Sequence, residues 1–521
     1  MRLLKSTAII GSMTLLSRIL GLIRDILWAK FLGASAVNDA ILTATKLPNL
    51  FRRMFAEGAF NSAFIPLYAR RLEGEGEEAA ANFAGEALSA LTLLVALIVI
   101  VFQLTMPWSL NLIGGGLDKV AGPDGLVPYD LAVLYARITM PYLLLMSLAA
   151  LFSGLLNTRS YFALASFVPV LLNVVWISAL LFPGTHELPP QTLALYLAVF
   201  MTVSGMLQAG FLVVGLRRAR IRLPLKWPRI TPGVRRLAQL GLPGLIAAGI
   251  THINLMVSHT IATFQTGAAS WLYYADRLYQ LPLGMIGIAM GVALLPALSR
   301  YLRAGEDGRA MDTLNRAAEI AAFLTLPAAA ALFIMPELLI STLFERGRFL
   351  SSDSLQAAKA LRMFALGLPA FVLLKVLAPT FFAREDTRTP MIFASLSAGV
   401  NLILGASLFF TVGFYGLALA TSVAAWGNVI CLAFVQRRDK HFILDARLKA
   451  RVPRMILAAA LMAAALAWLA PRAAPLRTGA ILWDYSLVGG VCAAGMGIYF
   501  ILAMALRAFG IADIRSALKK G

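Results

Sequence analysis

The sequence predicts an all-α polytopic membrane protein of about 14 transmembrane helices, arranged as two pseudo-symmetric six-helix lobes plus two extra C-terminal helices. The first observation is composition. The 521 residues are 60% hydrophobic and 14% charged, with a mean hydropathy of +0.78, which soluble globular domains do not reach. The second is that apolar stretches long enough to cross a bilayer recur along the whole chain. The third is that landmarks of the first half return in the second half at a nearly constant distance.

The apolar stretches define the expected spans in chain order. They cover residues 8–32, 37–66, 85–113, 129–156, 161–182, 191–215, 236–264, 269–298, 317–344, 355–382, 389–410, 414–435, 453–470 and 481–506. The first carries charges at its centre, and no small-residue cleavage site follows it, so we interpret it as a lasting span rather than a removable signal peptide. Prolines interrupt many spans, which is typical of helices that line a protein interior or a wet cavity.

The net charge of +20 is distributed unevenly between the two sides of the predicted membrane. With the N-terminus inside, the inner loops hold the basic runs 217–236 and 437–454, whereas the outer loops hold few lysines and arginines. This positive-inside asymmetry predicts a multi-pass protein with both termini cytoplasmic. The basic residues therefore serve topology and attraction to anionic membrane lipids, and we expect no nucleic-acid partner.

The two halves of the chain resemble each other. The matching pairs lie 230 or 228 residues apart: Pro66 with Pro296, Arg70 with Arg300, Pro141 with Pro369, and Asn173 with Asn401. The offset spans six helices, an even number, so the copies share their orientation and are expected to be related by an axis along the membrane normal. The predicted domains are an N-lobe at 1–216, a basic cytoplasmic linker at 217–235, a C-lobe at 236–440, and an addition at 441–521 with the last two spans and a cytoplasmic tail.

Charged residues stand inside the first span, where the surroundings should be apolar. An ionised group at bilayer depth costs about 3 kcal/mol on insertion scales, so such residues face a bundle interior or a water-filled cavity. Arg18 and Asp25 are seven residues apart and share a helical face, with Arg24 on a neighbouring face. The interior of the predicted bundle is therefore charged.

The second and eighth spans add to this charged interior. Asp39, Lys46 and Arg53 recur at seven-residue spacing on the second span and form one stripe. The inner end of that stripe is flanked by Arg52 and Glu57. In the eighth span Asp276 and Arg277 are adjacent, and because adjacent helical residues do not face each other, they should serve different neighbours.

Six cations stand against four carboxylates in this set. A cavity with surplus guanidinium should bind an anion, and the fork of arginine matches the oxygens of phosphate. The alternative is that the charges form internal salt bridges that hold the helices together.

The histidines, the cysteines and the known catalytic motifs give weaker indications of function. His252 and His259 share one face of the seventh span, where either a pH-dependent role or satisfied interior histidines would fit. Cys431 and Cys492 lie within spans, which gives no disulfide framework and no metal-ligand spacing. The P-loop, GxSxG and HExxH motifs do not occur, so the sequence predicts no ATP hydrolysis.

Small residues gather on the last span: Gly489, Gly490, Ala493, Ala494, Gly495 and Gly497. Close packing against a neighbouring helix is one interpretation. A groove that receives a lipid chain is the other, and the sequence leaves both open.

Three segments carry a resemblance to a known family. GLIRDILWAKFLGAS (21–35), NDAILTATKLPNLFRRMFAEGAFNSAFIPLY (38–68) and YYADRLYQLPLGMIGIAMGVALLP (273–296) resemble the bacterial lipid II flippases called MurJ or MviN, of the multidrug/oligosaccharidyl-lipid/polysaccharide exporter superfamily. The likeness extends over essentially the whole chain. The 38–68 segment is the most specific of the three.

The resemblance implies a transporter in the bacterial inner membrane rather than an enzyme. Its substrate would be lipid II, the undecaprenyl-pyrophosphate-linked peptidoglycan precursor, moved from the inner to the outer leaflet by alternating access. Other partners would be membrane lipids and the cell-wall synthesis machinery. The family lines its central cavity with arginines at positions matching Arg18, Arg24, Arg52 and Arg277, and the aspartate matching Asp39 is also implicated. The last two spans would correspond to a groove for the lipid tail.

Countercharge or gating roles are expected for Asp25, Asp39, Lys46, Arg53, Glu57 and Asp276. No cofactor is expected. Some members use sodium through a carboxylate in the C-lobe, but the seventh, eleventh and twelfth spans contain no Asp or Glu here, so the sequence leaves sodium, protons and the membrane potential open.

Two further function classes remain at this point. A flippase for another prenyl-pyrophosphate-linked oligosaccharide, or a multidrug exporter of the same superfamily, would share the lobes, although a cavity for organic cations should be acidic. A membrane-embedded enzyme acting on prenyl pyrophosphates would need a carboxylate or metal site near one interface, and the sequence offers none.

Overall fold

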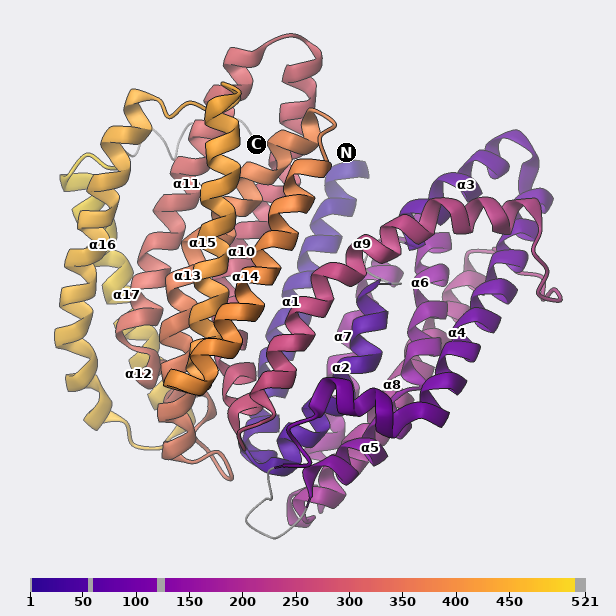
Figure 1. Cartoon of the computed structure of the whole chain (residues 1–521), viewed down its shortest axis with the longest axis horizontal. Helices are drawn as coiled ribbons and strands as arrows, with labels where there is room; N and C mark the ends of the chain where they lie inside the picture. The colour runs from indigo at the N-terminus through magenta and orange to yellow at the C-terminus, as the bar shows by residue number, and fades with distance from the viewer. Residues whose placement is uncertain (1, 55–59, 120–126, 511–521) are drawn as a thin grey trace. The chain divides into compact units, whose positions relative to one another are not determined.

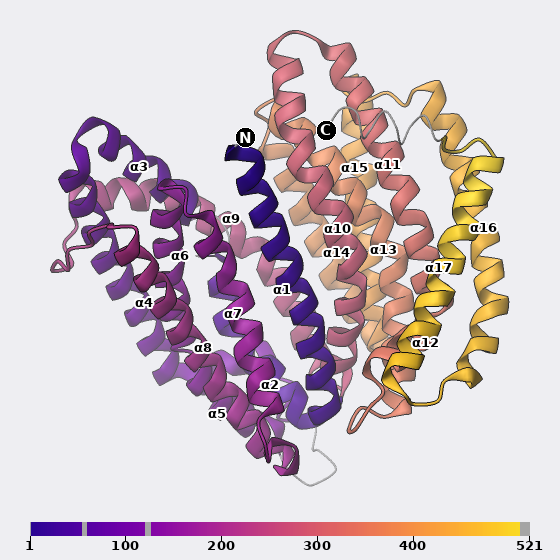
Figure 2. The ribbon, with the colours of Figure 1, turned by 180° about the vertical axis from the view of Figure 1, so that it is seen from behind.

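The computed structural model describes residues 2–54, 60–119 and 127–510, and it is helical throughout this part apart from turns and loops. The long helices, labelled in Figures 1 and 2, are α1 (Arg2–Leu32), α2 (Ala36–Met54), α3 (Phe60–Gly74), α4 (Gly76–Gly114), α5 (Pro128–Thr139), α6 (Tyr142–Thr158), α7 (Phe162–Leu181), α8 (Pro190–Arg218), α9 (Pro232–Ala262), α10 (Ala268–Arg303), α11 (Asp307–Ile334), α12 (Pro336–Phe344), α13 (Ser351–Ala383), α14 (Arg388–Val412), α15 (Tyr415–Arg438), α16 (Ala446–Ala473) and α17 (Ile481–Ala505).

The helices form two compact units. The first comprises Met1–Ser270 together with the short segment Arg346–Phe349, and the second comprises Trp271–Glu345 and Leu350–Gly521. In the first unit the Arg348 N–H donates to the Lys30 carbonyl at 2.9 Å. Gly33 makes this approach feasible, because its φ is +64° and a Cβ there would lie 2.3 Å from the Arg348 carbonyl oxygen.

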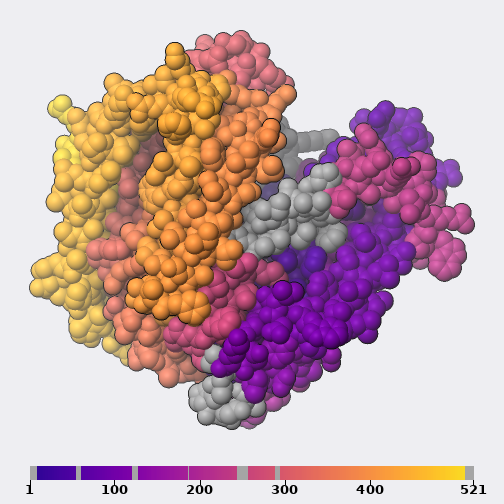
Figure 3. Space-filling view, viewed as in Figure 1, coloured from indigo at the N-terminus to yellow at the C-terminus, as the bar shows by residue number. Residues whose placement is uncertain are grey.

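The predicted membrane-spanning character is confirmed. Ten helices of the described chain are long and apolar enough to cross a bilayer. Their outward faces are apolar: α14 exposes Met391, Ile392, Leu396 and Ile403. In Figure 3 atoms of α14, α15 and α16 form much of the visible surface of the second unit. An apolar outer surface of this kind matches lipid rather than water.

Three expected spans are each built from two helices. The 37–66 stretch contains α2 and the start of α3, while 129–156 contains α5 and α6, which meet at Pro141. The 317–344 stretch contains α11 and α12, and the break falls where Pro336 begins α12. Because proline lacks an N–H and clashes with the preceding turn, a helix tends to end before it.

The internal repeat is visible in the packing. In the first unit α8 packs on α6 and α7, and α6 packs on α4. In the second unit α15 packs on α13 and α14, and α13 packs on α11. These are the same pairings of the third to sixth spans of each predicted lobe.

Helix α9 departs from the predicted lobe boundary. The sequence suggests that the second copy begins at residue 236, but α9 packs on α2, α3 and α4 and groups with the first unit. The repeat is a similarity between the two halves of the sequence. The contacts of α9 show that this helix packs within the first unit.

The two extra helices pack on the second unit. In Figures 1 and 2 α16 and α17 lie together at one edge of that unit. They share an apolar core with α11 and α12 that includes Phe323, Met335, Met455, Leu466 and Tyr499. Close van der Waals packing of these side chains attaches the addition to the lobe, because membrane helices associate through packing rather than through removal of apolar surface from water.

Candidate functional site

Arg24 lies in a structured polar cluster between α1 and α7. Its Nη2 and Nε donate to Asp25 Oδ1 at 2.7 and 3.0 Å, and its Nη1 donates to Asn173 Oδ1 at 3.0 Å. The guanidinium lies 5.0 Å from the ring centroid of Trp176. Its side chain is only 11% exposed, and Asp25 is buried. Arginine is long enough to curl back to its sequence neighbour, so this pair forms although adjacent helical positions point apart.

Asn173 fixes the orientation of this cluster. Its Nδ2 donates to the Ser17 carbonyl at 2.9 Å and to the Pro169 carbonyl at 3.1 Å, which turns its Oδ1 toward Arg24. The sequence signalled Asn173 only as a repeat landmark, and its partner Asn401 is likewise buried and accepts from Thr421 at 3.2 Å. A lone amide within an apolar span is the signal that would have identified it as a site residue.

Trp176 also links the cluster to the α1–α2 turn. Its ring centroid lies 4.9 Å from that of Trp28, whose Nε1 donates to Asn38 Oδ1 at 2.7 Å. Asn38 in turn donates to the Gly33 carbonyl and to Ser270 Oγ, both at 2.9 Å. These bonds hold the start of α2 against the end of α1.

Asp39 is 1% exposed and is held by donors from the start of α10. Its Oδ2 accepts from the Gly267 N–H at 2.6 Å, and its Oδ1 accepts from the Ser270 N–H at 2.9 Å and from Ser270 Oγ at 2.5 Å. A carboxylate beneath the first N–H groups of a helix is favoured by the helix dipole. Asp39 therefore anchors the α9–α10 connection to α2.

The basic residues of the α2 stripe, and Arg52 beside it, are half-buried. Lys46, Arg52 and Arg53 lie on the continuous helix α2, and Arg52 Nε donates to Asn49 Oδ1 at 3.2 Å. The seven-residue spacing therefore does place Asp39, Lys46 and Arg53 along one helical face. Glu57 lies outside the described residues.

Arg18 and His259 occupy different settings in the first unit. Arg18 is half-buried on α1, one turn before Gly21. His259 is buried, and its Nε2 lies 2.9 Å from Thr43 Oγ1, so this histidine is satisfied by a hydrogen bond. The side chain of His252 lies outside the described part.

In the second unit Asp276 and Arg277 lie next to each other on α10. Asp276 accepts a hydrogen bond from Gln280. The guanidinium of Arg277 lies 4.5 Å from the ring centroid of Tyr273. Arg24 and Arg277 thus each lie against an aromatic ring, on which the planar guanidinium of arginine can stack.

A second charged cluster escaped the sequence analysis. Glu319 on α11 is 2% exposed and is paired with Arg316 of its own helix and with Arg447 and Arg451 of α16, the Arg447 Nε lying 3.2 Å away. Arg316 also pairs with Asp445, which caps α16 by accepting from the Leu448 N–H at 2.6 Å. The cluster ties α16 to the lobe. Its signal was a carboxylate at the start of an apolar span.

The small residues of α17 divide into two groups. A Cβ added at Gly495 would lie 3.0 Å from Leu466 of α16, so this glycine serves helix packing. Around Gly489, Gly490 and Gly497 no described heavy atom lies within 4 Å of the same position. These glycines therefore leave an outward face of α17 shallow, and helix packing within the described chain does not explain them.

The arrangement is suited to holding an anion, because guanidinium groups donate charge-assisted hydrogen bonds. Among the described residues, no three His, Cys, Asp or Glu side chains come together as a metal site. The features that stand out are guanidinium groups oriented by carboxylate, amide and aromatic neighbours.

Comparisons with known proteins identify the family of this chain. A family model described as lipid II flippase MurJ matches residues 28–486. The chain is 42% identical to the probable lipid II flippase MurJ of Rhizobium meliloti (strain 1021), over 100% of this chain and 97% of the relative. It is 36% identical to the probable lipid II flippase MurJ of Vibrio cholerae serotype O1, over 90% and 89% of the two chains.

Solved structures show the same fold. A lipid II flippase MurJ in an inward closed conformation superposes with a TM-score of 0.77 at 24% identity, covering 95% of this chain and 97% of that one. An inward-facing multidrug resistance transporter of the MATE family and MOP superfamily gives 0.66 at 16% identity, covering 83% and 95%. With the family model matching most of its length and relatives above 30% identity along almost all of it, the chain belongs to the MurJ lipid II flippase family.

Proposed function

We propose that this protein translocates lipid II from the inner to the outer leaflet of the bacterial cytoplasmic membrane. Its membership of the family and its full-length similarity to relatives named lipid II flippase support the substrate. The single structural observation that carries the proposal is Arg24, a guanidinium held within a membrane-spanning helix by Asp25, Asn173 and Trp176.

Arg24 and Arg277 bind the pyrophosphate in this proposal. A guanidinium donates two parallel hydrogen bonds to phosphate oxygens, and each such charge-assisted bond is stronger than a neutral one. Asp25 and Asn173 fix the plane of the Arg24 guanidinium, so little side-chain entropy is lost on binding. Arg18 and Arg52 line the approach. Glu57 and Asp276 act as countercharges when the arginines exchange partners, and Lys46 and Arg53 take part in gating.

The prenyl tail stays in lipid and follows α17. The open positions at Gly489, Gly490 and Gly497 support this role, because a flat helix face admits a polyprenyl chain without displacing side chains. The addition of α16 and α17 to a six-helix repeat then has a purpose that a multidrug exporter does not share.

The distribution of charged residues suggests the orientation of the protein in the membrane and a source of energy for transport. Both termini lie in the cytoplasm, where the basic linker meets anionic headgroups. The head group enters from the cytoplasmic side, and the lobes expose it alternately to each side. The membrane potential is worth about 2.3 kcal/mol per charge per 100 mV, which suffices to bias the cycle if one net charge moves. The cell-wall machinery supplies lipid II on one side and consumes it on the other.

Complementation tests the proposal. In a bacterium whose own lipid II flippase is depleted, this chain should restore growth and clear the accumulated lipid II. Growth failure with the protein present at normal levels in the membrane would contradict it. Accumulation of a different prenyl-pyrophosphate oligosaccharide on inactivation of the chain in its own host would favour the related flippase. Product formation by the purified protein would instead indicate the enzyme.

A further inference from the structure

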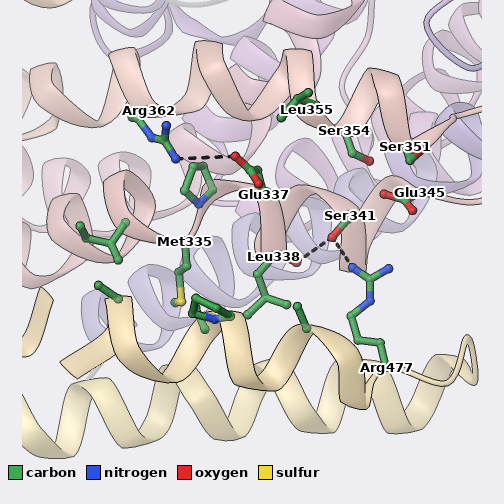
Figure 4. A pocket seen from close by; sticks show the side chains of 16 residues that line it. Met335, Glu337, Leu338, Ser341, Glu345, Ser351, Ser354, Leu355, Arg362 and Arg477 are labelled. Atoms are coloured by element: carbon green, nitrogen blue, oxygen red, sulfur yellow. Dashed lines mark hydrogen bonds and ion pairs between the residues drawn. The ribbon is translucent and has the colours of Figure 1, made fainter. Parts of the chain in front are cut away.

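A separate cavity of about 550 Å³ lies in the second unit between α12, the start of α13 and the end of α16 (Figure 4). Ala467, Ala470, Pro471 and Ala474 form its apolar wall on the α16 side. The walls formed by α12 and α13 combine polar side chains with apolar ones such as Leu338 and Leu355. The residues that the proposed transport uses do not line this cavity.

Charges of both signs line the cavity in equal number. Arg362 Nη2 lies 3.7 Å from Glu337 Oε1, and Arg477 donates to Ser341 Oγ. Glu345 is the remaining charged residue of the lining, and in Figure 4 it lies on the same side as Arg477. A purely anionic or purely cationic ligand would meet a repelling partner here, whereas a ligand that carries both charges is matched.

The cavity also has unused hydrogen-bonding capacity. Ser354 is 4% exposed, and its hydroxyl has no partner among the described residues. The Nε of Arg477 is buried and likewise has no partner in the described chain. Buried polar groups normally have a partner, so these two lining residues have hydrogen-bonding capacity that the described chain does not use.

Two tryptophans indicate the depth of the cavity in the membrane. Trp468 and Trp483 are 60% and 53% exposed and flank the connection from α16 to α17, with the Arg472 guanidinium 4.0 Å from the Trp468 ring centroid. Exposed tryptophans of membrane proteins gather at the level of the lipid headgroups. The cavity, which includes Pro471 and Arg477 of this same connection, therefore lies at headgroup depth.

We propose that this cavity binds a phospholipid with a phosphoethanolamine head group. The phosphate accepts hydrogen bonds from Arg477, and the primary ammonium donates to Glu345. The first carbons of an acyl chain lie along the alanine wall of α16. A choline head group cannot donate to a carboxylate, and a glycerol head group carries no cation to pair with Glu345, so both should bind more weakly.

Lipid titration of the purified, delipidated full-length protein tests the proposal. The probes are diacyl phosphatidylethanolamine, phosphatidylcholine and phosphatidylglycerol, with binding read by native mass spectrometry and by the lipid-induced rise in the thermal unfolding temperature. Phosphatidylethanolamine should bind at least about tenfold more tightly than the other two, as expected for one additional charge-assisted hydrogen bond. Glu345→Gln should remove that preference, whereas Arg477→Gln should weaken both phosphatidylethanolamine and phosphatidylglycerol.

The matched control is Arg472→Gln, which removes a cation at the same depth outside the cavity and should change nothing. Ser354→Ala should fold normally, because it deletes a hydroxyl that has no partner among the described residues. It should keep the lipid-free unfolding temperature and weaken the binding of phosphatidylethanolamine. Equal affinity for the three lipids, or an unchanged preference in Glu345→Gln, would overturn the proposal. Equal binding of water-soluble glycerophosphoethanolamine would also overturn it, because the ligand would then not be a lipid.

Discussion

At the scale of single residues, the proposed transport depends on how guanidinium groups are held. Arg24 is oriented by a carboxylate, an amide and an indole, and Arg277 by a phenol ring. These neighbours define a plane for each arginine. A lysine at either position would carry the same charge without that plane, so charge and geometry can be separated experimentally.

Arg24→Lys should therefore lose transport nearly as completely as Arg24→Ala, by at least about tenfold, because an ammonium cannot make the bidentate bond to phosphate. The measurement is complementation of a flippase-depleted strain, with the membrane level of each variant quantified. Arg309→Lys, which changes an exposed arginine of a surface ion pair with Glu306, is the matched control and should be silent. Full activity of Arg24→Lys would show that positive charge alone suffices.

Asp39→Asn should destabilise the protein by about 2 kcal/mol, because the amide replaces a charged acceptor that now takes hydrogen bonds from Gly267 and Ser270. Thermal unfolding in detergent measures the effect, and Asp312→Asn, at an exposed carboxylate of α11, should leave the unfolding temperature unchanged. If Asp39 only anchors the chain, residual transport will track the amount of folded protein. Transport that vanishes in a fully folded variant would instead show a role in gating.

Sequence reasoning found the charged residues and not their partners. Arg24, Asp39 and Arg277 stand out because a charge in an apolar span is costly. Their neighbours Asn173, Ser270 and Trp176 come from other helices, and only tertiary packing brings them together. The pairing of Arg24 with Asp25 was equally hidden, since helical periodicity says that adjacent residues diverge.

At the scale of elements, α16 and α17 form an addition that is fastened at its apolar core and at one ionic cluster. The core lies against α11 and α12, and the cluster surrounds Glu319. What remains outward on α17 is the small-residue face. The existence of these helices could be predicted from hydropathy, whereas the space around each glycine depends on tertiary packing, which distinguishes Gly495 from Gly489, Gly490 and Gly497.

A bulky residue at Gly490 should obstruct a lipid tail without disturbing the fold. Gly490→Phe is expected to keep the unfolding free energy within about 0.5 kcal/mol, because Gly490 is exposed and no described heavy atom of a neighbouring element lies within 4 Å of the added Cβ. It should weaken binding of a long-prenyl substrate more than that of a short-chain analogue. Gly495→Phe, which meets Leu466, is the contrasting variant and should destabilise by about 1–3 kcal/mol and affect both analogues alike. Equal loss for both analogues in Gly490→Phe would argue against a tail groove.

Glu319→Gln should detach the addition from the lobe in part. Removing the carboxylate leaves Arg316, Arg447 and Arg451 facing one another, and breaking a buried ion pair costs about 3 kcal/mol or more. The readout is thermal unfolding together with protease sensitivity of the 439–445 connection. Glu306→Gln, at the exposed pair with Arg309, should have almost no effect. Equal stability of the two variants would mean that the apolar core alone holds α16.

At the scale of the whole molecule, the two halves of the chain resemble each other. Four pairs of landmark residues predicted this repeat from the sequence, and the third to sixth spans of each half pack in the same pairs. What the repeat could not predict is the grouping of α9 with the first unit, because contacts depend on which surface a helix buries and not on its ancestry. The fold is shared with multidrug transporters of the MATE family, so fold alone does not decide the substrate.

The surplus of cations in the interior should exclude organic cations. Expression of this protein in cells that lack their own exporters is expected to leave ethidium accumulation unchanged, since a cation would meet repelling arginines. A MATE-family exporter expressed in parallel provides the positive control. Lower ethidium retention that persists in Arg24→Ala cells would show a cation pathway that the proposed function does not contain.

The central claim is tested most directly by reconstituting the purified protein in liposomes that contain labelled lipid II and measuring, with an impermeant reagent, how fast labelled head groups reach the opposite leaflet. We expect rapid movement of lipid II head groups between the leaflets with the wild-type protein. With equal reconstituted amounts of Arg24→Ala or Arg277→Ala, we expect only the rate of protein-free liposomes. Movement of lipid II by either alanine variant at the wild-type rate would contradict the proposal that these arginines bind the pyrophosphate during transport.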